Sequence, residues 1–391
     1  MSRGLYALLF AQFLTAFGDN AILFAVIAIA FKTIAARPWY VPALQGSFLV
    51  AYVVLAPWVG TFADHRSKRQ VLIIGNALKA AGTLALLFGV EPLLSYGFIG
   101  VGAAVYAPAK YGILPELVDH THLVKANAWI EGSTIVSILV GTVIGARIAD
   151  HSIPWAIALV FIMYGLSMLT TMLVPHTAPV VQTRKAALPH FLSMIKGLVH
   201  SNRARFSMLG VSIFWAVAAV LRVLLVAWAP VVLLTKNTSD IANLTLFIAI
   251  GIVLGAIVAP RLIPLEKLRR ARLAAYALGA CIFLFGSAHS LWPARVALLL
   301  IGLTGGIFVV PINAALQEIG YHSIGSGGVI AVQEFFQNVF MMVSVGLYTV
   351  VAAKGVSPVN SILVLGVIVF ALTFLVTWRL PPRVLESSDE L

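Results

Sequence analysis

Charged residues are scarce in this chain. Of its 391 residues only 10% are Asp, Glu, Lys or Arg, while 61% are hydrophobic. Soluble domains typically carry about 25% charged residues, so this composition excludes an ordinary water-soluble domain. Cysteine is nearly absent as well: Cys281 is the only one, and it cannot form an internal disulfide. We interpret it as a small hydrophobic side chain of the protein interior.

Apolar segments of strand length are also missing, because the hydrophobic runs continue far beyond the roughly 9–11 residues of a barrel strand. A helix that crosses a bilayer needs roughly 20 apolar residues. Twelve stretches of this kind occur: 5–31, 42–63, 71–90, 93–114, 126–149, 154–174, 206–234, 241–260, 273–290, 294–316, 329–350 and 361–378. The sequence therefore predicts an all-α integral membrane protein with twelve transmembrane helices. The first run is too long for the apolar region of a cleavable signal, so we expect it to remain as the first helix.

The net charge of +12 would by itself suggest a nucleic-acid partner, but the positions of the charges argue against one. With the N-terminus inside, 17 of the 26 Lys and Arg fall in cytoplasmic loops and 6 fall outside. This positive-inside bias predicts that both chain ends are cytoplasmic. We expect the basic loops to contact anionic membrane lipid and expect no nucleic acid.

Two charges stand out because each lies near the middle of a long apolar run. Asp19 is the only charged residue of 5–31, and Arg222 is the only one of 206–234. A charge at bilayer mid-depth costs from about 3 to over 10 kcal/mol, so it normally faces a bundle interior or a wet cavity. We expect both charges, each otherwise uncompensated, to face one central polar site, as in a transporter.

Asp19 and Arg222 lie 203 residues apart, and this offset recurs without a gap. It also relates Pro57 to Pro260, Arg66 to Arg269, Arg69 to Arg272, Gly102 to Gly305, Pro108 to Pro311 and Glu131 to Glu334. Six helices per copy is an even number, so both copies start on the same side of the membrane and the repeats are parallel.

The repeat divides the chain into four parts. We expect a six-helix bundle over 1–174, a basic cytoplasmic linker over 175–205, a second six-helix bundle over 206–380 and a cytoplasmic tail over 381–391. The linker contains five basic residues and no acidic one. Its segment 188–199 could form an amphipathic helix on the inner membrane surface, and a solvated basic linker is the alternative.

The loop between the second and third predicted helices reads GTFADHRSKR over 60–69. It resembles the loop signature of the major facilitator superfamily: Gly60, Asp64 and Arg69 fit, whereas His65 and Ser67 replace the usual basic residue and glycine. The resemblance implies a major facilitator fold, in which the aspartate caps a neighbouring helix N-terminus and stabilises one gating state. A basic stop-transfer loop is the alternative interpretation.

Several short strings are more specific than this loop. They read AQFLTAFGDNA over 11–21, YAPAKYGIL over 106–114, LVKANA over 123–128, LRVLLVAW over 221–228 and VVPINA over 309–314. Together they resemble the lysophospholipid transporters of Gram-negative bacteria, which are major facilitator members. This resemblance implies a flippase that moves lysophospholipid, chiefly lysophosphatidylethanolamine, from the outer to the inner leaflet of the inner membrane. There a partner acyltransferase/acyl-carrier-protein synthetase would restore the missing acyl chain.

The charged residues suit such a substrate. Arginine can bind two phosphate oxygens through its planar fork, and a carboxylate can pair with the ammonium of ethanolamine. We therefore assign Arg222 to the phosphate and Asp19, beside Asn20, to the ammonium. Lys110 could receive the phosphate near the inner end of its helix, or could instead extend its ammonium to the membrane surface.

Further candidates are less specific. Glu131 and Glu334 could contact substrate, pair within the protein or carry protons, and Glu334 shares a polar stripe with Gln333, Gln337 and Asn338. Two pairs of glycines spaced four residues apart permit close helix contact. If their helices meet at the seam between the two halves, as in major facilitator folds, they could form a lateral gate; ordinary tight packing is the alternative. The pairs are Gly141 with Gly145 and Gly251 with Gly255.

Two other functions compete with this interpretation. One is a proton-coupled major facilitator exporter of a drug or metabolite, with Asp19 as the proton carrier. The other is a membrane-bound enzyme such as a lysolipid acyltransferase, which uses a histidine followed five residues later by an aspartate. None of the 9 histidines here has such an aspartate. No metal cluster, nucleophile triad or phosphate-binding loop is apparent, so we expect neither an enzyme nor a cofactor.

Overall fold

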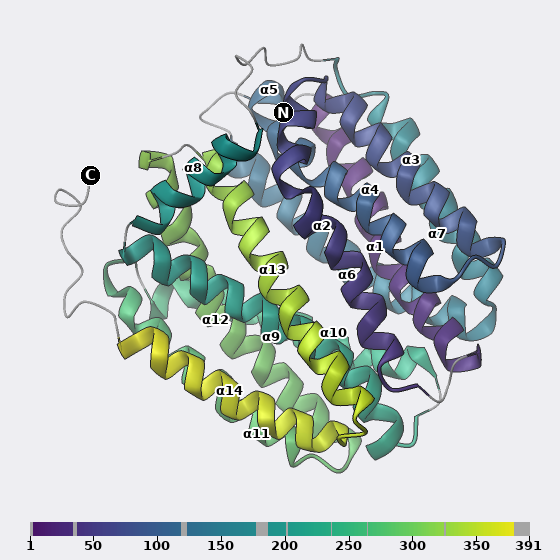
Figure 1. Ribbon diagram of the computed structural model, residues 1–391, viewed down its shortest axis with the longest axis vertical. Coiled ribbons are helices and arrows are strands. Elements are labelled where there is room, and N and C mark those ends of the chain that lie inside the picture. The colour runs from purple at the N-terminus through teal and green to yellow at the C-terminus, as the bar shows by residue number, and fades with distance from the viewer. Residues whose placement is uncertain are drawn as a thin grey trace. The chain divides into compact units, whose positions relative to one another are not determined.

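The computed structural model describes residues 3–33, 37–118, 123–176, 187–200, 202–235, 237–263, 265–323 and 326–378. Within these ranges every regular element is a helix (Figure 1). The all-α prediction is confirmed for this part of the chain. The tail 381–391 and most of the linker before residue 187 lie outside the described residues.

The chain forms two compact units. Unit 1 comprises Met1–His190 together with Asn237–Ala242, and unit 2 comprises Phe191–Lys236 and Asn243–Leu391. The helices of unit 1 are α1 (Arg3–Thr33), α2 (Tyr40–Asp64), α3 (Lys68–Leu87), α4 (Pro92–Gly112), the short α5 (Leu114–Leu117), α6 (Leu123–His151) and α7 (Ile153–Thr171).

Most of α8 (Ala187–His200) belongs to unit 2. It is followed by α9 (Asn202–Val232), α10 (Thr238–Leu262), the 3-10 helix η2 (Leu265–Arg270), α11 (Ala271–Gly286), α12 (Leu291–Ser323), α13 (Ser326–Ala353) and α14 (Pro358–Trp378). The first turn of α10 belongs to unit 1, where Asp150 of α6 binds it. The Asp150 carboxylate accepts hydrogen bonds from the backbone N–H groups of Thr238 and Ser239, each 2.8 Å long.

The internal repeat is visible in how the helices pack. In unit 1, α1 packs on α6 and α7, and α3 packs on α4 and α7. In unit 2, α9 packs on α13 and α14, and α11 packs on α12 and α14. These are the same contacts shifted by one repeat. Four helices carry an internal proline at matching positions: Pro57 in α2, Pro108 in α4, Pro260 in α10 and Pro311 in α12.

Each of the twelve predicted transmembrane stretches corresponds to a helix of its own. Eleven of the described helices are long and apolar enough to cross a membrane. The twelfth, α11, has 16 residues and continues directly from η2. Large apolar side chains also cover the outside of the helices, such as Leu94 at 69% exposure and Trp155 at 71%. Such a surface suits lipid rather than water, and the protein is a multi-pass membrane protein.

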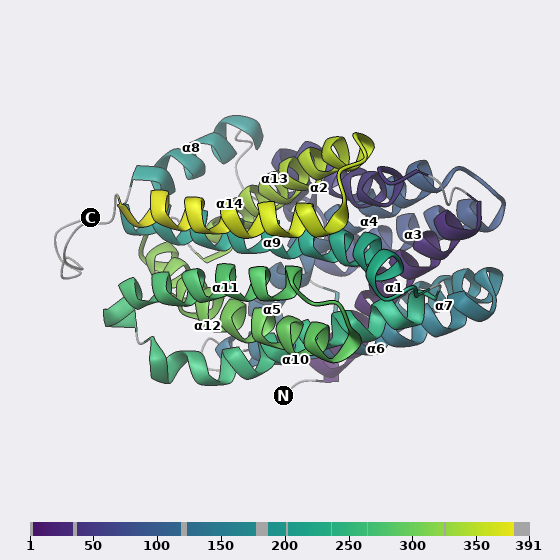
Figure 2. The same cartoon turned by 90° about the horizontal axis from the view of Figure 1, so that it is seen from below.

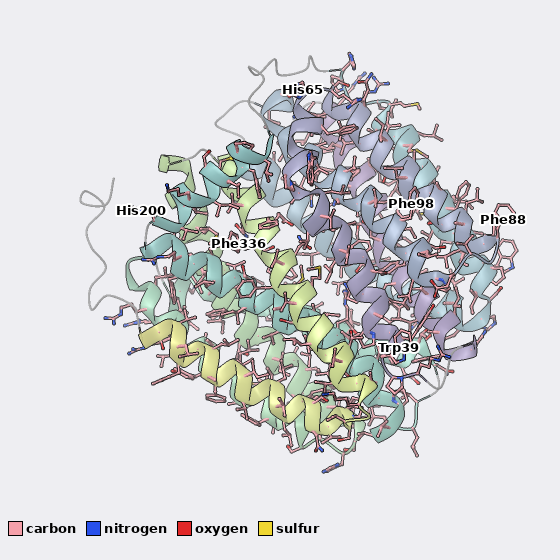
Figure 3. All side chains as sticks on the ribbon, viewed as in Figure 1. Trp39, His65, Phe88, Phe98, His200 and Phe336 are labelled. Carbon is pink, nitrogen blue, oxygen red and sulfur yellow. The ribbon has the colours of Figure 1, made fainter. Side chains whose placement is uncertain are left out.

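Two labelled side chains show the direction of α2 in unit 1. His65 and Trp39 lie at opposite ends, and α2 runs between them (Figure 3). Phe88 and Phe98 are both exposed, and Figure 3 shows Phe88 pointing away from the helices. Aromatic side chains on the outside of a helix bundle are typical of a surface that contacts lipid and its headgroup boundary.

A helix over 188–199, one of the two alternatives for the linker, is present as α8, at the periphery of unit 2 (Figures 1 and 2). Its inward side contributes Phe191, whose ring meets Phe335 of α13 edge-on at 5.3 Å between centroids. Its outward side carries Leu188, Leu192 and Lys196, which are exposed. The helix thus has one side packed on unit 2 and one side that exposes two leucines and a lysine. Whether α8 lies on the membrane surface stays a prediction.

Candidate functional site

Asp19 does not stand alone in its helix. Its carboxylate Oδ2 forms an ion pair with the ammonium of Lys79 in α3, at 2.8 Å. Its other oxygen, Oδ1, accepts a hydrogen bond from the hydroxyl of Tyr164 in α7, also at 2.8 Å. The expectation that Asp19 is an uncompensated charge is therefore wrong. The counter-charge comes from another helix of the same unit, which explains how a carboxylate can lie mid-helix in an apolar bundle.

Lys79 is the more deeply buried partner of this ion pair. Its side chain is 1% exposed, whereas that of Asp19 is 26% exposed. The ammonium also donates a hydrogen bond to the Thr15 hydroxyl at 3.0 Å, and it lies over the ring of Tyr106, 4.8 Å from the centroid. A buried ammonium is stable only when its donors are satisfied and a counter-ion is close. Here Asp19 is the counter-ion, the ammonium donates two hydrogen bonds, and its charge also lies over the Tyr106 ring.

Hydrogen bonds extend from Lys79 into the core of unit 1. The Thr15 hydroxyl donates to Asn76 Oδ1 at 2.6 Å, and Asn76 Nδ2 donates to the Ser167 hydroxyl at 2.9 Å. Ser167 in turn donates to the backbone carbonyl of Ala11 at 2.7 Å. Helices α1, α3 and α7 are thus tied together by a continuous polar chain. We call Thr15, Asp19, Asn76, Lys79, Tyr164 and Ser167 the polar cluster.

The spacing of polar residues along each helix indicates this cluster. Isolated charges in apolar runs do not indicate it by themselves. On each of the three helices the polar residues recur three or four positions apart, so that they share one face. The pairs are Thr15 and Asp19 on α1, Asn76 and Lys79 on α3, and Tyr164 and Ser167 on α7. Lys79 was not predicted as a site residue, yet an intramembrane cation is the natural counterpart for the one acid in the first helix.

Unit 2 has no equivalent cluster among its described residues. At the repeat offset of 203, Lys79 corresponds to Ile282, Asn76 to Gly279 and Ser167 to Phe370. Ile282 is fully buried, and a side chain at Gly279 would come within 2.8 Å of the Phe370 ring. That ring also stacks near Tyr276 and Phe283. Apart from Arg222 at the position of Asp19, the residues of unit 2 that match the polar cluster are therefore apolar.

The other predicted substrate residues lie on α9, α4 and α1. Arg222 is half-buried in the middle of α9 in unit 2, and Lys110 is half-buried in the last turn of α4. Neither is isolated in the structure. Asn20 is half-buried beside Asp19, and its amide donates to the Ala16 carbonyl at 2.9 Å. The structure thus places Asp19 and Asn20 together in unit 1, while the roles of these residues toward substrate stay predictions.

The polar stripe on α13 is present. Gln333 and Asn338 are buried, Glu334 is half-buried, and Gln333 Nε2 donates to Asn313 Oδ1 of α12 at 2.7 Å. Part of the stripe therefore serves to pair α13 with α12. The side chain of Glu131 lies outside the described residues, so its role stays a prediction.

The loop signature holds helix ends together in unit 1. Lys68 donates to the Ala63 carbonyl near the end of α2 at 2.9 Å, and Arg69 donates to the Val174 carbonyl just after α7 at 3.3 Å. Cations are favourable there because helix C-termini leave carbonyls unpaired and carry partial negative charge. Ser67 caps α3 by accepting a hydrogen bond from Gln70 N–H at 3.3 Å.

Two other residues of the signature are less informative. The Asp64 side chain, predicted to cap a helix, lies outside the described residues. Gly60 has open space around the position of a Cβ atom. A gating role for Gly60, Asp64 and Arg69 stays a prediction.

The two glycine pairs permit close contact within each unit. A methyl group on Gly141 would come within 2.6 Å of the Phe17 carbonyl oxygen, and one on Gly145 within 2.5 Å of Ala21 Cα, both in α1. Side chains at Gly251 and Gly255 would collide with the backbone of α12. These contacts support tight helix packing, which was the alternative interpretation. A gating role for the four glycines stays a prediction without support from these contacts.

Comparisons with known proteins agree with this architecture. Residues 8–345 match the family model described as Major Facilitator Superfamily. Among solved structures, a POT family transporter in complex with 5-aminolevulinic acid superimposes with a TM-score of 0.76 at 13% identity, covering 96% of each chain. The nucleoside transporter NupG gives a TM-score of 0.73 at 14% identity, covering 97% of this chain and 100% of that one. At such identities these structures show the fold alone.

Curated relatives are much closer in sequence. The chain is 40% identical over 382 residues to the lysophospholipid transporter LplT of Photorhabdus laumondii, covering 97% of this chain and 96% of the relative. It is 41% identical over 381 residues to the protein of the same name from Klebsiella pneumoniae, covering 96% of both. With identity at this level over nearly their whole length, the chain belongs to the LplT family of the major facilitator superfamily, a family of transporters rather than enzymes.

Proposed function

We propose that this chain is a lysophospholipid transporter that acts as a flippase. Its preferred substrate is lysophosphatidylethanolamine, which it moves from the outer to the inner leaflet of the bacterial inner membrane. The observation that carries this proposal is the 40–41% identity to proteins named lysophospholipid transporter LplT, sustained over 96–97% of the chain. A charged site inside otherwise apolar helices adds support, because a membrane-embedded charge usually marks a substrate or ion pathway.

The headgroup is divided between two residues in this proposal. Arg222 binds the phosphodiester, because guanidinium can donate two parallel hydrogen bonds to its oxygens. Asp19 receives the other end of the headgroup, because about a quarter of its side chain stays open at 26% exposure. Asn20, Glu131 and Glu334 contribute further polar contacts, and Lys110 meets the phosphate as it moves inward.

The charge distribution supports an orientation with both chain ends in the cytoplasm. Lipid delivered to the inner leaflet there reaches an acyltransferase/acyl-carrier-protein synthetase, which we propose as the functional partner. In this arrangement 175–205 links two six-helix bundles on the cytoplasmic side, with the tail 381–391 on the same side. A reporter fused near Gln182 should be accessible only from the cytoplasm; access only from the periplasm would refute the orientation.

The direct test follows labelled lysophosphatidylethanolamine in spheroplasts. Inward movement should occur in spheroplasts that carry this protein and not in those that lack it, and an uncoupler arm would identify coupling to protons. Equal movement with and without the protein would refute the proposed function.

The role of Arg222 has its own test. Arg222→Lys keeps the positive charge but loses the planar fork, so transport of every lysophospholipid should fall when expression is matched. A loss confined to one headgroup would contradict phosphate binding by Arg222.

A further inference from the structure

Lys79 and Tyr164 hold the Asp19 carboxylate from its buried side. The Lys79 ammonium donates to Oδ2 and the Tyr164 phenol donates to Oδ1, each at 2.8 Å. An ionised carboxylate offers about four lone-pair positions, so these two bonds leave acceptor capacity on the open side of Asp19. The carboxylate can therefore receive further donors from outside the cluster without releasing either partner.

Lys79 itself is fixed in place and out of reach. Its side chain is 1% exposed, and its ammonium is committed to Asp19, to Thr15 at 3.0 Å and to the ring face of Tyr106. Thr15 is in turn held by Asn76 at 2.6 Å. A substrate group that approaches Asp19 therefore meets a carboxylate whose negative charge is already balanced by a lysine behind it.

We propose that Lys79 is a specificity-determining residue, which balances the charge of Asp19 so that this carboxylate serves headgroups as a hydrogen-bond acceptor and not as a net anion. The inference rests on the proposed function and adds to it the residue that sets headgroup specificity. An ammonium N–H and a hydroxyl O–H can both donate to such an acceptor. Lys79 thus limits how strongly Asp19 favours the ammonium of the preferred substrate over a hydroxyl headgroup, whereas an unbalanced carboxylate would select ammonium strongly.

Charge balance can be changed in both directions with small substitutions. Asp19→Asn leaves the lysine charge unbalanced and disfavours ammonium, while Lys79→Met leaves the carboxylate unbalanced and favours it. The double variant Asp19→Asn/Lys79→Met is neutral again. A unit charge within a few ångströms of the headgroup is expected to alter the relative rates more than about tenfold at the effective dielectric of a protein.

The experiment measures transport of lysophosphatidylethanolamine and of lysophosphatidylglycerol with the same acyl chain, in spheroplasts with matched amounts of folded protein. We expect the ratio of the two rates to fall at least about tenfold in Asp19→Asn and to rise at least about tenfold in Lys79→Met. In the double variant the ratio should return to within about threefold of wild type, even if both rates are lower. Lys32→Met, at an exposed lysine near the end of α1, is the matched control and should change neither rate.

The double variant decides the outcome, because it buries no unbalanced charge and is the variant best able to fold. If its ratio is as low as that of Asp19→Asn, Asp19 pairs with ammonium directly and Lys79 does not set specificity. If no variant changes the ratio, the polar cluster is structural only, and the inference is equally refuted. A wild-type protein that moves neither lipid refutes the proposed function itself, and the inference with it.

Discussion

The ion pair between Asp19 and Lys79 makes a sharp prediction about stability. Asp19→Asn leaves an ammonium that is 1% exposed without a counter-ion. Removing one member of a buried pair costs about 3 to 5 kcal/mol, because the remaining charge stays desolvated. Lys79→Met should cost less, about 1 to 3 kcal/mol, since the carboxylate keeps its bond from Tyr164 and its partial exposure of 26%.

The double variant should be more stable than the sum of its parts predicts. Replacing both charges by neutral groups of similar size is often close to neutral, so we expect a total cost within about 2 kcal/mol. The free energy of unfolding of the four proteins, measured by equilibrium denaturation in mixed detergent micelles, gives the coupling energy directly. Costs that add to within about 0.5 kcal/mol would show that the two charges do not stabilise each other and would refute the reasoning.

Three further predictions concern helix ends and helix contacts, each measured by thermal or denaturant unfolding. Ser67→Ala removes the cap of α3 and should cost about 1 kcal/mol, whereas Ser67→Gly should cost only a few tenths; equal costs would contradict the cap. Gly145→Ala should destabilise by about 1 to 3 kcal/mol because α1 lies against it. Gly132→Ala on the same helix has open space and should be neutral or slightly stabilising, so equal effects would contradict the importance of close packing at Gly145. Asp150→Ala should lose about 1 to 2 kcal/mol of capping at α10 while Asp150→Asn loses less; no loss in Asp150→Ala would refute that role.

The fold was accessible from the sequence because its signals are long and local. Each apolar stretch is long enough to identify one helix, and the 203-residue offset alone predicts the repeat. The predicted helix ends were less accurate where a capping residue determines the first residue of a helix. The third predicted stretch began at residue 71, but α3 begins at Lys68 because Ser67 caps it.

The site was only half predictable, because its partners are distant along the chain. Asp19 and Arg222 were found as charges in apolar runs, but Lys79 is 60 residues from Asp19 and Tyr164 is 145 residues away. No pattern within a single helix predicts that α1, α3 and α7 pack against one another. The contacts between these residues become apparent only in the folded structure. The glycine spacing predicted close packing, and we expected it at the seam between the halves; the glycines instead contact α1 and α12 within their own units.

The two repeats share a fold, but equivalent positions in them carry different side chains. Unit 1 carries a balanced acid and lysine, while unit 2 carries Arg222 at the position of Asp19 and buried Ile282 at the position of Lys79. A symmetric substrate would not require such a difference. A lysophospholipid headgroup is asymmetric, since its phosphate needs a cation and its other end offers hydrogen-bond donors. In the proposed function Arg222 meets the first need and Asp19, balanced by Lys79, meets the second, so the difference between the repeats is what a headgroup with two different ends requires.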